Sequence, residues 1–193
     1  MNIDLMRKPR IRIVPQMHGG GQEKGIRSGT VAPFLCIGLG KACELISKNM
    51  YVDNQRIKEL SDFFYNKLNT SLEKIYLNGD KTHRVPHNLN ISFAGVEGES
   101  LVLSLADCVA VSTGSACSSE SLESSYVLKA LNVDEDLAHT SIRFGIGKYT
   151  TREQLDTVAD KIIENVKRLR SISPIWEMLE QGIDLKTIEW KGH

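Results

Sequence analysis

Apolar residues recur at the spacing of an amphipathic helix in two consecutive stretches near the start of the chain. The first stretch begins at Pro33, a residue that suits the first turn of a helix, and continues to Ile46. The second places its apolar positions at Ile57, Leu60, Phe64 and Leu68. Together they predict one long helical rod with a bend near residues 49–53. Cys36 and Cys43 fall in the apolar pattern of the first stretch, which predicts buried thiols.

The sequence pattern predicts short strands in residues 11–14, 74–77, 89–93 and 141–146. The last of them alternates most clearly. Arg143 and Gly145 share one of its faces, opposite an apolar face. A glycine beside an arginine leaves room for another group to approach that side of the strand.

Helical patterns separate and follow these strands, in residues 98–107, in residues 126–131 and beyond Thr150. Thr150 and Glu153 have the spacing of a capping box at the start of the last of these helices. The order of elements predicts an α+β fold. We expect a small, mainly antiparallel sheet with helices packed on one face, preceded by a long linker helix.

Charge and cysteine spacing exclude several classes of function. The 193 residues carry 24 basic and 24 acidic side chains, so nothing predicts a nucleic-acid or membrane surface as a direct partner. No apolar run has the length of a membrane span, and the first residues lack a signal-peptide pattern, so we expect a cytoplasmic protein. The four cysteines have neither the spacing of a disulfide framework nor that of a zinc site.

One cysteine differs from the others in its surroundings. Cys117 lies in residues 112–125, a segment of mostly small polar residues that has no core of its own and predicts a mobile surface loop. An exposed cysteine in such a loop can react as a thiolate, whereas a buried cysteine is inert. Two interpretations follow: a free thiol in a flexible connection, or a nucleophile on a moving arm.

A glycine-rich segment, residues 18–30, precedes the first helix. Its three consecutive glycines permit backbone angles that other residues resist, which predicts either a flexible linker or a loop that lines a ligand site. Thr30 also has two interpretations. It is an ordinary helix cap, which the residue pattern favours, or a hydroxyl that joins the helix N-terminus in binding a phosphate.

Several motifs occur in a fixed order along the chain. They are HGGGQE at 18–23, RSGT at 27–30, VEGES at 96–100, GSAC at 114–117, SIRF at 141–144 and IEW at 188–190. This set resembles the C-terminal half of the pyridoxal-phosphate-dependent cysteine desulfurases of the NifS/IscS type, within the class V aminotransferases. The resemblance implies that residues 1–52 end the large domain of a fold-type I enzyme and add its linker helix. Residues 53–193 would then form the small C-terminal domain, with the cysteine loop and a C-terminal tail.

The resemblance gives Cys117 a reaction. In this family pyridoxal phosphate serves as an electron sink, and the cysteine that matches Cys117 takes the sulfur of L-cysteine as a persulfide while alanine is released. The sulfur goes to iron–sulfur cluster assembly and to tRNA thiolation, so an iron–sulfur scaffold protein and other sulfur acceptors are the implied partners. Cys117 is then shared transiently with a nascent iron–sulfur cluster on the scaffold, and no other metal site is implied.

Two further residues gain roles from the resemblance. Arg143 matches the arginine that binds the substrate carboxylate, a task that suits a planar, bidentate donor. Its alternative is a surface arginine paired with an acid. Thr30 matches the threonine that reaches the cofactor phosphate of a neighbouring subunit, which implies a homodimer. Residues 176–190 match the part that helps to dock the scaffold, with folding back on the same domain as the alternative.

The cofactor lysine of the family does not appear in these 193 residues. In the family it follows a histidine, and no histidine here is followed by lysine. We therefore expect the chain alone to be inactive, without covalently bound pyridoxal phosphate, and to act with a missing N-terminal half. A non-catalytic remnant that keeps the dimer or scaffold-docking surface is the alternative, and a selenocysteine lyase-like enzyme is a weaker one. Ser124 and Thr113 stand where the family usually has proline and serine.

Overall fold

The computed structural model describes residues 13–113 and 124–183, so Cys117 and the C-terminal tail lie outside the described part. The chain divides into two compact units, one ending at Tyr51 and the other beginning at Val52. A single helix, α1 (Pro33–Ser71), contributes residues to both units. It is the one continuous helix that the two helical stretches of the sequence predicted. Of the strand predicted in residues 11–14, residues 13 and 14 form no strand, and the first two residues lie outside the described part.

The first unit consists of a glycine-rich loop and the first half of α1. The loop contains a 3-10 helix, η1 (Gln22–Gly25), and a parallel bridge joins Met17 to Arg27. Cys43 is exposed and Cys36 is half-buried, so the prediction of buried thiols is wrong. The described residues of this unit include no second element that covers the half-helix. Its exposed apolar side chains are Phe34, Leu35, Ile37, Leu45, Ile46, Met50 and Tyr51.

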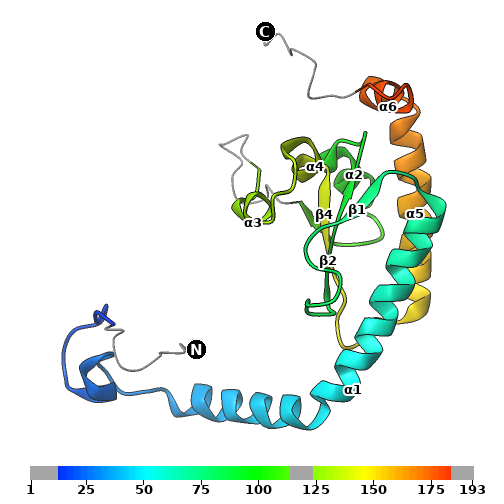
Figure 1. The fold of residues 1–193 in the computed structure, drawn as a ribbon. Coiled ribbons are helices and arrows are strands. Elements are labelled where there is room, and N and C mark those ends of the chain that lie inside the picture. The colour runs from blue at the N-terminus through cyan, green and yellow to red at the C-terminus, as the bar shows by residue number, and fades with distance from the viewer. Residues whose placement is uncertain (1–12, 114–123, 184–193) are drawn as a thin grey trace. The chain divides into compact units, whose positions relative to one another are not determined.

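A four-stranded sheet with the strand order β1-β2-β4-β3 organises the second unit (Figure 1). Its strands are β1 (Ile75–Leu77), β2 (Asn88–Phe93), β3 (Ser112–Thr113) and β4 (Ser141–Gly145). Every pairing between them is antiparallel. Strand β4 lies between β2 and β3. Because β3 leads into the segment that contains Cys117, the start of that segment lies beside a central strand of the sheet.

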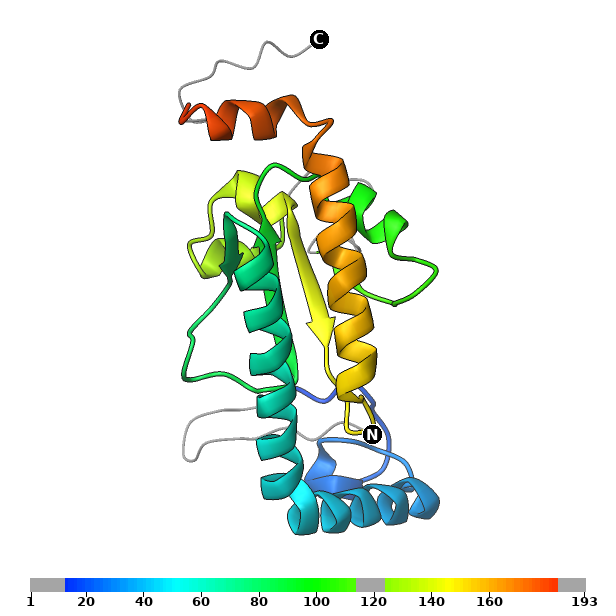
Figure 2. The ribbon, with the colours of Figure 1, turned by 90° about the vertical axis from the view of Figure 1, so that its right-hand side faces the viewer.

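Two long helices cover one face of this sheet, the second half of α1 and α5 (Arg152–Arg170) (Figures 1 and 2). The shorter helices are α2 (Gly98–Ser104), α3 (Tyr126–Ala130), α4 (Glu135–His139) and α6 (Pro174–Glu180). The structure confirms the predicted α+β fold, with a small antiparallel sheet, helices on one face and a long helix before it.

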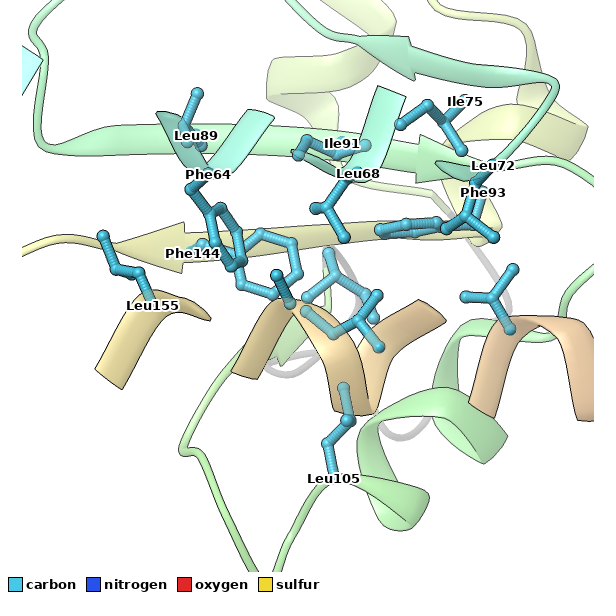
Figure 3. Close-up of a cluster of buried hydrophobic side chains, with 14 of the residues drawn as sticks. Phe64, Leu68, Leu72, Ile75, Leu89, Ile91, Phe93, Leu105, Phe144 and Leu155 are labelled. Atoms are coloured by element: carbon cyan, nitrogen blue, oxygen red, sulfur yellow. The ribbon is translucent and has the colours of Figure 1, made fainter. Parts of the chain in front are cut away.

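The hydrophobic core lies between the sheet and the two long helices (Figure 3). The ring of Phe144 packs edge-on against Phe64 of α1, with 5.3 Å between centroids, and against Phe93 of β2, with 6.4 Å. Such aromatic pairs contribute about 0.5–1.5 kcal/mol beyond the burial of their surface. Because Ile142 and Phe144 are both buried, the alternation of β4 places Arg143 on the opposite face.

Helix α5 begins one residue later than the sequence pattern predicted. The Thr151 hydroxyl accepts a hydrogen bond from the Gln154 amide at 3.2 Å, and the Gln154 side chain accepts one from the Thr151 amide at 3.0 Å. The predicted box of Thr150 and Glu153 is therefore wrong. Thr150 instead accepts a hydrogen bond from the amide of Gly147 at 3.0 Å, which closes the turn after β4. Both pairs have capping-box spacing, and the tight turn selects the second.

A glutamate caps α2. The Glu97 carboxylate accepts hydrogen bonds from the amides of Glu99 and Ser100, at 2.9 Å and 2.6 Å. Burial raises the pKa of Glu97, but hydrogen bonds from Ser100 and Glu99 outweigh it and hold that pKa below its ordinary value. The charged form of Glu97 therefore stabilises the start of α2.

Close packing of α2 requires a glycine. A Cβ atom on Gly98 would lie 2.5 Å from the carbonyl oxygen of His139 and 3.7 Å from Cγ2 of Thr113. The first distance is far shorter than any normal contact, and the atom it meets belongs to the backbone. Gly98 thus lets α2 rest against the end of α4 and beside the last residue of β3. This contact explains the glycine of the VEGES motif in structural terms.

Gly98→Ala is expected to lower the free energy of unfolding by about 1–3 kcal/mol, because the backbone of His139 must move away from the added methyl group. Gly147→Ala is the matched control. A Cβ atom there meets only the Thr150 hydroxyl at 3.7 Å, so the change should stay within about 0.5 kcal/mol. Urea unfolding followed by circular dichroism measures both. Equal midpoints for the two variants would contradict the packing argument.

Glu97→Gln is expected to destabilise the protein by at most about 1 kcal/mol at neutral pH, because the carboxylate is exposed and water competes for its hydrogen bonds. A lowered folded-state pKa means that this stabilisation is complete above the unfolded pKa of about 4.3 and is lost as pH falls through the folded value. The difference between wild type and variant should therefore shrink toward about pH 3. Thermal unfolding across this range checks it, and a constant difference would contradict it.

Candidate functional site

Arg143 lies exposed on the polar face of β4. Its Nε donates a hydrogen bond to the Ser112 hydroxyl at 3.2 Å, and Ser112 is its direct partner in the register between β3 and β4. Within residues 13–113 and 124–183, no carboxylate lies at ion-pair distance from the guanidinium. The alternative of a surface arginine held by an acid thus finds no acid in the described part of the chain.

The sheet face around Arg143 is polar and partly open. Asn90 lies opposite Arg143 on β2. Asn78 donates hydrogen bonds to the Asn90 side-chain oxygen at 2.6 Å and to the Ser92 hydroxyl at 2.8 Å. On the other side of Arg143, a Cβ atom placed on Gly145 would meet nothing within 4 Å. Among the described residues, the strand face beside Arg143 therefore has open space at Gly145 and a row of amide and hydroxyl groups on β2 and directly after β1.

The turn that follows β4 is clamped to the second half of α1. Arg56 donates one hydrogen bond to the Thr150 carbonyl at 3.0 Å and a second to the Lys148 carbonyl. The ammonium of Lys148 also lies 3.3 Å from the Asp53 carboxylate. These contacts hold the turn at the C-terminal end of β4 against α1. They therefore fix the position of the strand that carries Arg143.

The base of the cysteine loop lies beside Arg143. Cys117 itself lies outside the described residues, so its role stays a prediction. Strand β3 ends at Thr113, and the described chain resumes at Ser124. Ser124 is buried and its hydroxyl finds no hydrogen-bond partner among the described residues, while Ser125 caps α3. Both ends of the predicted loop thus join ordered elements of the second unit.

Thr30 is exposed and does not cap α1. The helix begins at Pro33, and the carbonyl of Ala32 accepts the amide hydrogens of the first turn, so Ala32 holds the capping position. Ser28 has a different task, because its hydroxyl donates to the Gly20 carbonyl at 2.7 Å. The capping interpretation of Thr30 is therefore wrong. The Thr30 hydroxyl makes no hydrogen bond within the described part of the chain.

The loop that precedes Thr30 is held in a defined conformation by contacts within the loop. The side-chain oxygen of Gln22 accepts a hydrogen bond from the Gly29 amide at 3.2 Å. A Cβ atom on Gly20 would lie 2.6 Å from that same oxygen, so the loop closes around a residue without a side chain. A free hydroxyl on such a loop fits a phosphate oxygen. The chain thus offers a group for the phosphate end of pyridoxal phosphate, and its sequence offers no lysine in the context that the family uses.

Sequence reasoning missed Ser112 and Arg56. Ser112 became relevant only through the register that sets it opposite Arg143, and pairing between strands 31 positions apart leaves no local pattern. Arg56 lies in an amphipathic helix, where an arginine is ordinary, and its role depends on a turn far along the chain. Neither residue carries a signal that composition or spacing could have revealed.

The described ranges contain neither a metal-binding cluster nor a membrane-spanning helix. Across residues 13–113 and 124–183, no three His, Cys, Asp or Glu side chains gather into a group that could hold a metal ion. No helix in those ranges is long and apolar enough to cross a membrane.

Comparisons with known proteins agree with this arrangement. The family model described as Aminotransferase class-V matches residues 12–158. The chain is 53% identical over 191 residues to a cysteine desulfurase of Homo sapiens, which covers 99% of this chain and 42% of that protein. It is 52% identical over 189 residues to the cysteine desulfurase IscS of Ectopseudomonas mendocina, which covers 98% and 46%. The chain therefore spans less than half the length of these relatives.

A solved structure shows the same fold. A protein described as NifS-like matches with a TM-score of 0.70 at 28% identity, over 84% of this chain and 41% of that one. The family match covers well over half of the chain, and the identity to cysteine desulfurases extends over nearly all of it. The chain therefore belongs to the class-V aminotransferase family and, within it, is similar to the cysteine desulfurases of the IscS and NifS type.

Proposed function

We propose that this chain is the C-terminal part of a cysteine desulfurase and that Cys117 takes sulfur from L-cysteine. The observation that carries the proposal is identity of 53% and 52% to cysteine desulfurases over 99% and 98% of the chain. In the reaction, the Cys117 thiolate attacks the substrate sulfur. A sulfur–sulfur bond forms as the carbon–sulfur bond breaks, and the carbon gains a proton to become alanine. Pyridoxal phosphate, on which this family depends, supplies an electron sink when bound.

Arg143 is proposed to bind the substrate carboxylate. Arg143 is exposed and has no acidic partner among the described residues, and a Cβ atom on Gly145, on the same face of the strand, would meet none of those residues within 4 Å. A planar guanidinium with free N–H groups binds a carboxylate through two parallel hydrogen bonds, which fixes both position and orientation. The clamp on the turn after β4 supports the role, because a substrate-binding strand must not move relative to its core.

Chain length supports a meeting of Cys117 with a substrate on Arg143. Cys117 follows Thr113 by four positions, so the chain places its Cα atom within about 14 Å of the Thr113 Cα atom. Ser112, the residue before Thr113, is paired with Arg143. Cys117 is therefore tethered close to a substrate that is bound to Arg143. The serine- and glycine-rich composition of this segment suits a nucleophile that must also reach an acceptor protein.

The remaining parts of the enzyme are proposed to cover the first unit. The exposed apolar side chains on the first half of α1 are unusual for a surface helix, and they suit burial by an N-terminal half that carries the cofactor lysine. The 193 residues alone are then inactive. Thr30, free and exposed, is proposed to reach the cofactor phosphate of a second subunit in a homodimer.

The sulfur is proposed to pass to an iron–sulfur scaffold protein and to acceptors for tRNA thiolation, in the cytoplasm. Cys117 would there share a nascent cluster transiently, and residues 176–190 would help to dock the scaffold. Trp176 itself stacks on Arg170 of the second unit, with 3.8 Å from the guanidinium carbon to the ring centroid, which for this residue favours the alternative of folding back on the same domain. A non-catalytic remnant, or a lyase that acts on selenocysteine, would lack the Cys117-dependent sulfur transfer, which the following tests measure.

Mixing this chain with the N-terminal half of the Ectopseudomonas relative is expected to produce sulfide from L-cysteine in the presence of a thiol reductant and pyridoxal phosphate. The chain alone should produce none, because it has no lysine in the required context. Methylene-blue detection of sulfide measures both. Release by the chain alone would overturn the proposed need for a second half, and no release by the mixture would favour the non-catalytic alternative.

Cys117→Ala is expected to abolish transfer of sulfur to a protein acceptor in that mixture, whereas Cys108→Ala should leave it unchanged. Cys108 is the control because it is a free cysteine that the structure places at the surface. Burial, together with Asp107 beside it, raises the pKa of Cys108, so it is a poor thiolate at neutral pH. Transfer of radiolabelled sulfur from cysteine to the acceptor is the measurement. Transfer that survives Cys117→Ala would remove the persulfide role.

Arg143→Lys is expected to raise KM for cysteine about ten-fold, because lysine keeps the charge but loses the bidentate geometry. Arg168→Lys is the control, since the Arg168 guanidinium donates a hydrogen bond only to the Asn165 side chain of its own helix, at 3.2 Å, among the described side chains. Steady-state kinetics of the reconstituted enzyme measure both KM values. An unchanged KM in Arg143→Lys would contradict the role of Arg143.

A further inference from the structure

The hydrogen bond between Ser112 and Arg143 joins the predicted substrate site to the base of the cysteine loop. Nε of Arg143 donates to the Ser112 hydroxyl at 3.2 Å. The two residues are direct partners in the β3–β4 register, so their side chains lie on the same face of the sheet. Ser112 is also the first residue of the short strand that leads into the loop.

This bond decides which edge of the guanidinium remains free. A guanidinium can bind a carboxylate through the edge formed by Nε and one Nη, or through the edge formed by its two Nη atoms. The Ser112 hydroxyl occupies Nε, so the Nη edge is left for the ligand. The contact thereby selects one of two binding geometries and limits rotation of a long, otherwise exposed side chain.

The chemical nature of residue 112 matters as much as its place. A hydroxyl oxygen accepts the Nε hydrogen without cancelling the charge of the guanidinium. A carboxylate at that position would hold Arg143 equally well, but it would compete with the substrate for the same cation. A methyl group would leave the cation free and unoriented. Serine is thus the kind of residue that orients an arginine for another anion.

We propose that Ser112 is a positioning residue for substrate binding: it holds Arg143 with its Nη edge toward the carboxylate of the amino-acid substrate. The inference rests on the proposed function, in which Arg143 binds that carboxylate. Because Ser112 starts the strand that leads to Cys117, the same contact fixes the origin of the nucleophile's tether relative to the bound substrate. Ser112 does not touch the reacting atoms.

The first test needs no activity and uses the full chain labelled with 15N-arginine. The Nε–H signal of Arg143 is identified by its loss in Arg143→Lys. We expect exchange of that hydrogen with water to accelerate at least about five-fold in Ser112→Ala and to stay near the wild-type rate in Ser112→Thr, which keeps the hydroxyl. Ser171→Ala is the control, since its hydroxyl contacts only the Arg168 carbonyl, at 2.8 Å, among the described groups. Equal exchange in wild type and Ser112→Ala would overturn the proposal.

The second test uses the enzyme reconstituted with its N-terminal half. Ser112→Ala should raise KM for cysteine about five-fold with kcat within about two-fold of wild type, and Ser112→Thr should restore KM. Ser112→Asp should raise KM further, because its carboxylate competes for Arg143. A merely structural role predicts instead that the aspartate variant binds cysteine no worse than the alanine variant.

The outcomes separate this inference from the function on which it rests. If Arg143→Lys raises KM while Ser112→Ala and Ser112→Asp leave it unchanged, the carboxylate role stands and the role of Ser112 is overturned. If Arg143→Lys itself leaves KM unchanged, the carboxylate role fails and the role of Ser112 fails with it. A loss of kcat at unchanged KM in Ser112→Ala would place the residue in sulfur transfer and would also overturn the proposal.

Discussion

The two-residue alternation of strand β4 is the constraint on which the rest of the molecule depends. Phe144 and Ile142 are buried between the sheet and the two long helices, and this burial fixes the rotation of the strand. A shift of one residue would bring Arg143 into the core, where an unpaired guanidinium is strongly disfavoured. The same packing that stabilises the second unit therefore directs the proposed substrate-binding group to the open face.

Residues on the elements next to β4 complete the surroundings of Arg143. Strand β3 adds the Ser112 hydroxyl on one side, and the Asn90 side chain lies on the other. The Arg56 clamp holds the turn at the end of the strand. Gly98 lets α2 lie close to the last residue of β3. These contacts hold the end of β3, from which the chain continues toward Cys117, beside the proposed substrate-binding arginine.

The sequence predicted those parts of the molecule that local patterns determine. The alternation around Arg143 and the apolar stripe through Phe64 recur in the structure, because a strand face and a helix face are set by spacing alone. The predicted start of α5 was wrong by one residue. Two adjacent residue pairs have capping-box spacing, and Thr150 is used instead in the turn after β4. The exposure of Cys43 was missed, because an apolar helix stripe shows that a surface is to be covered but not what covers it.

The residues of the proposed site likewise differ in whether the sequence could indicate them. Residue types and motif order indicated Cys117, Arg143 and Thr30, because the resemblance assigns roles position by position. Ser112 came only from the strand register, since a serine among several serines carries no distinguishing pattern. The structure also removed the capping role that the residue pattern favoured for Thr30, and so it left that hydroxyl available for a phosphate.

We propose that Cys117 of this chain receives the sulfur of cysteine when the N-terminal half of the enzyme is supplied. Peptide mass spectrometry of the chain after one turnover with 34S-labelled cysteine, with free thiols alkylated before digestion, tests this directly. We expect one labelled sulfur atom on the peptide that contains Cys117 and none on the peptides that contain Cys36, Cys43 or Cys108. Labelled sulfide in solution with an unmodified Cys117 peptide, or label on another cysteine, would contradict it.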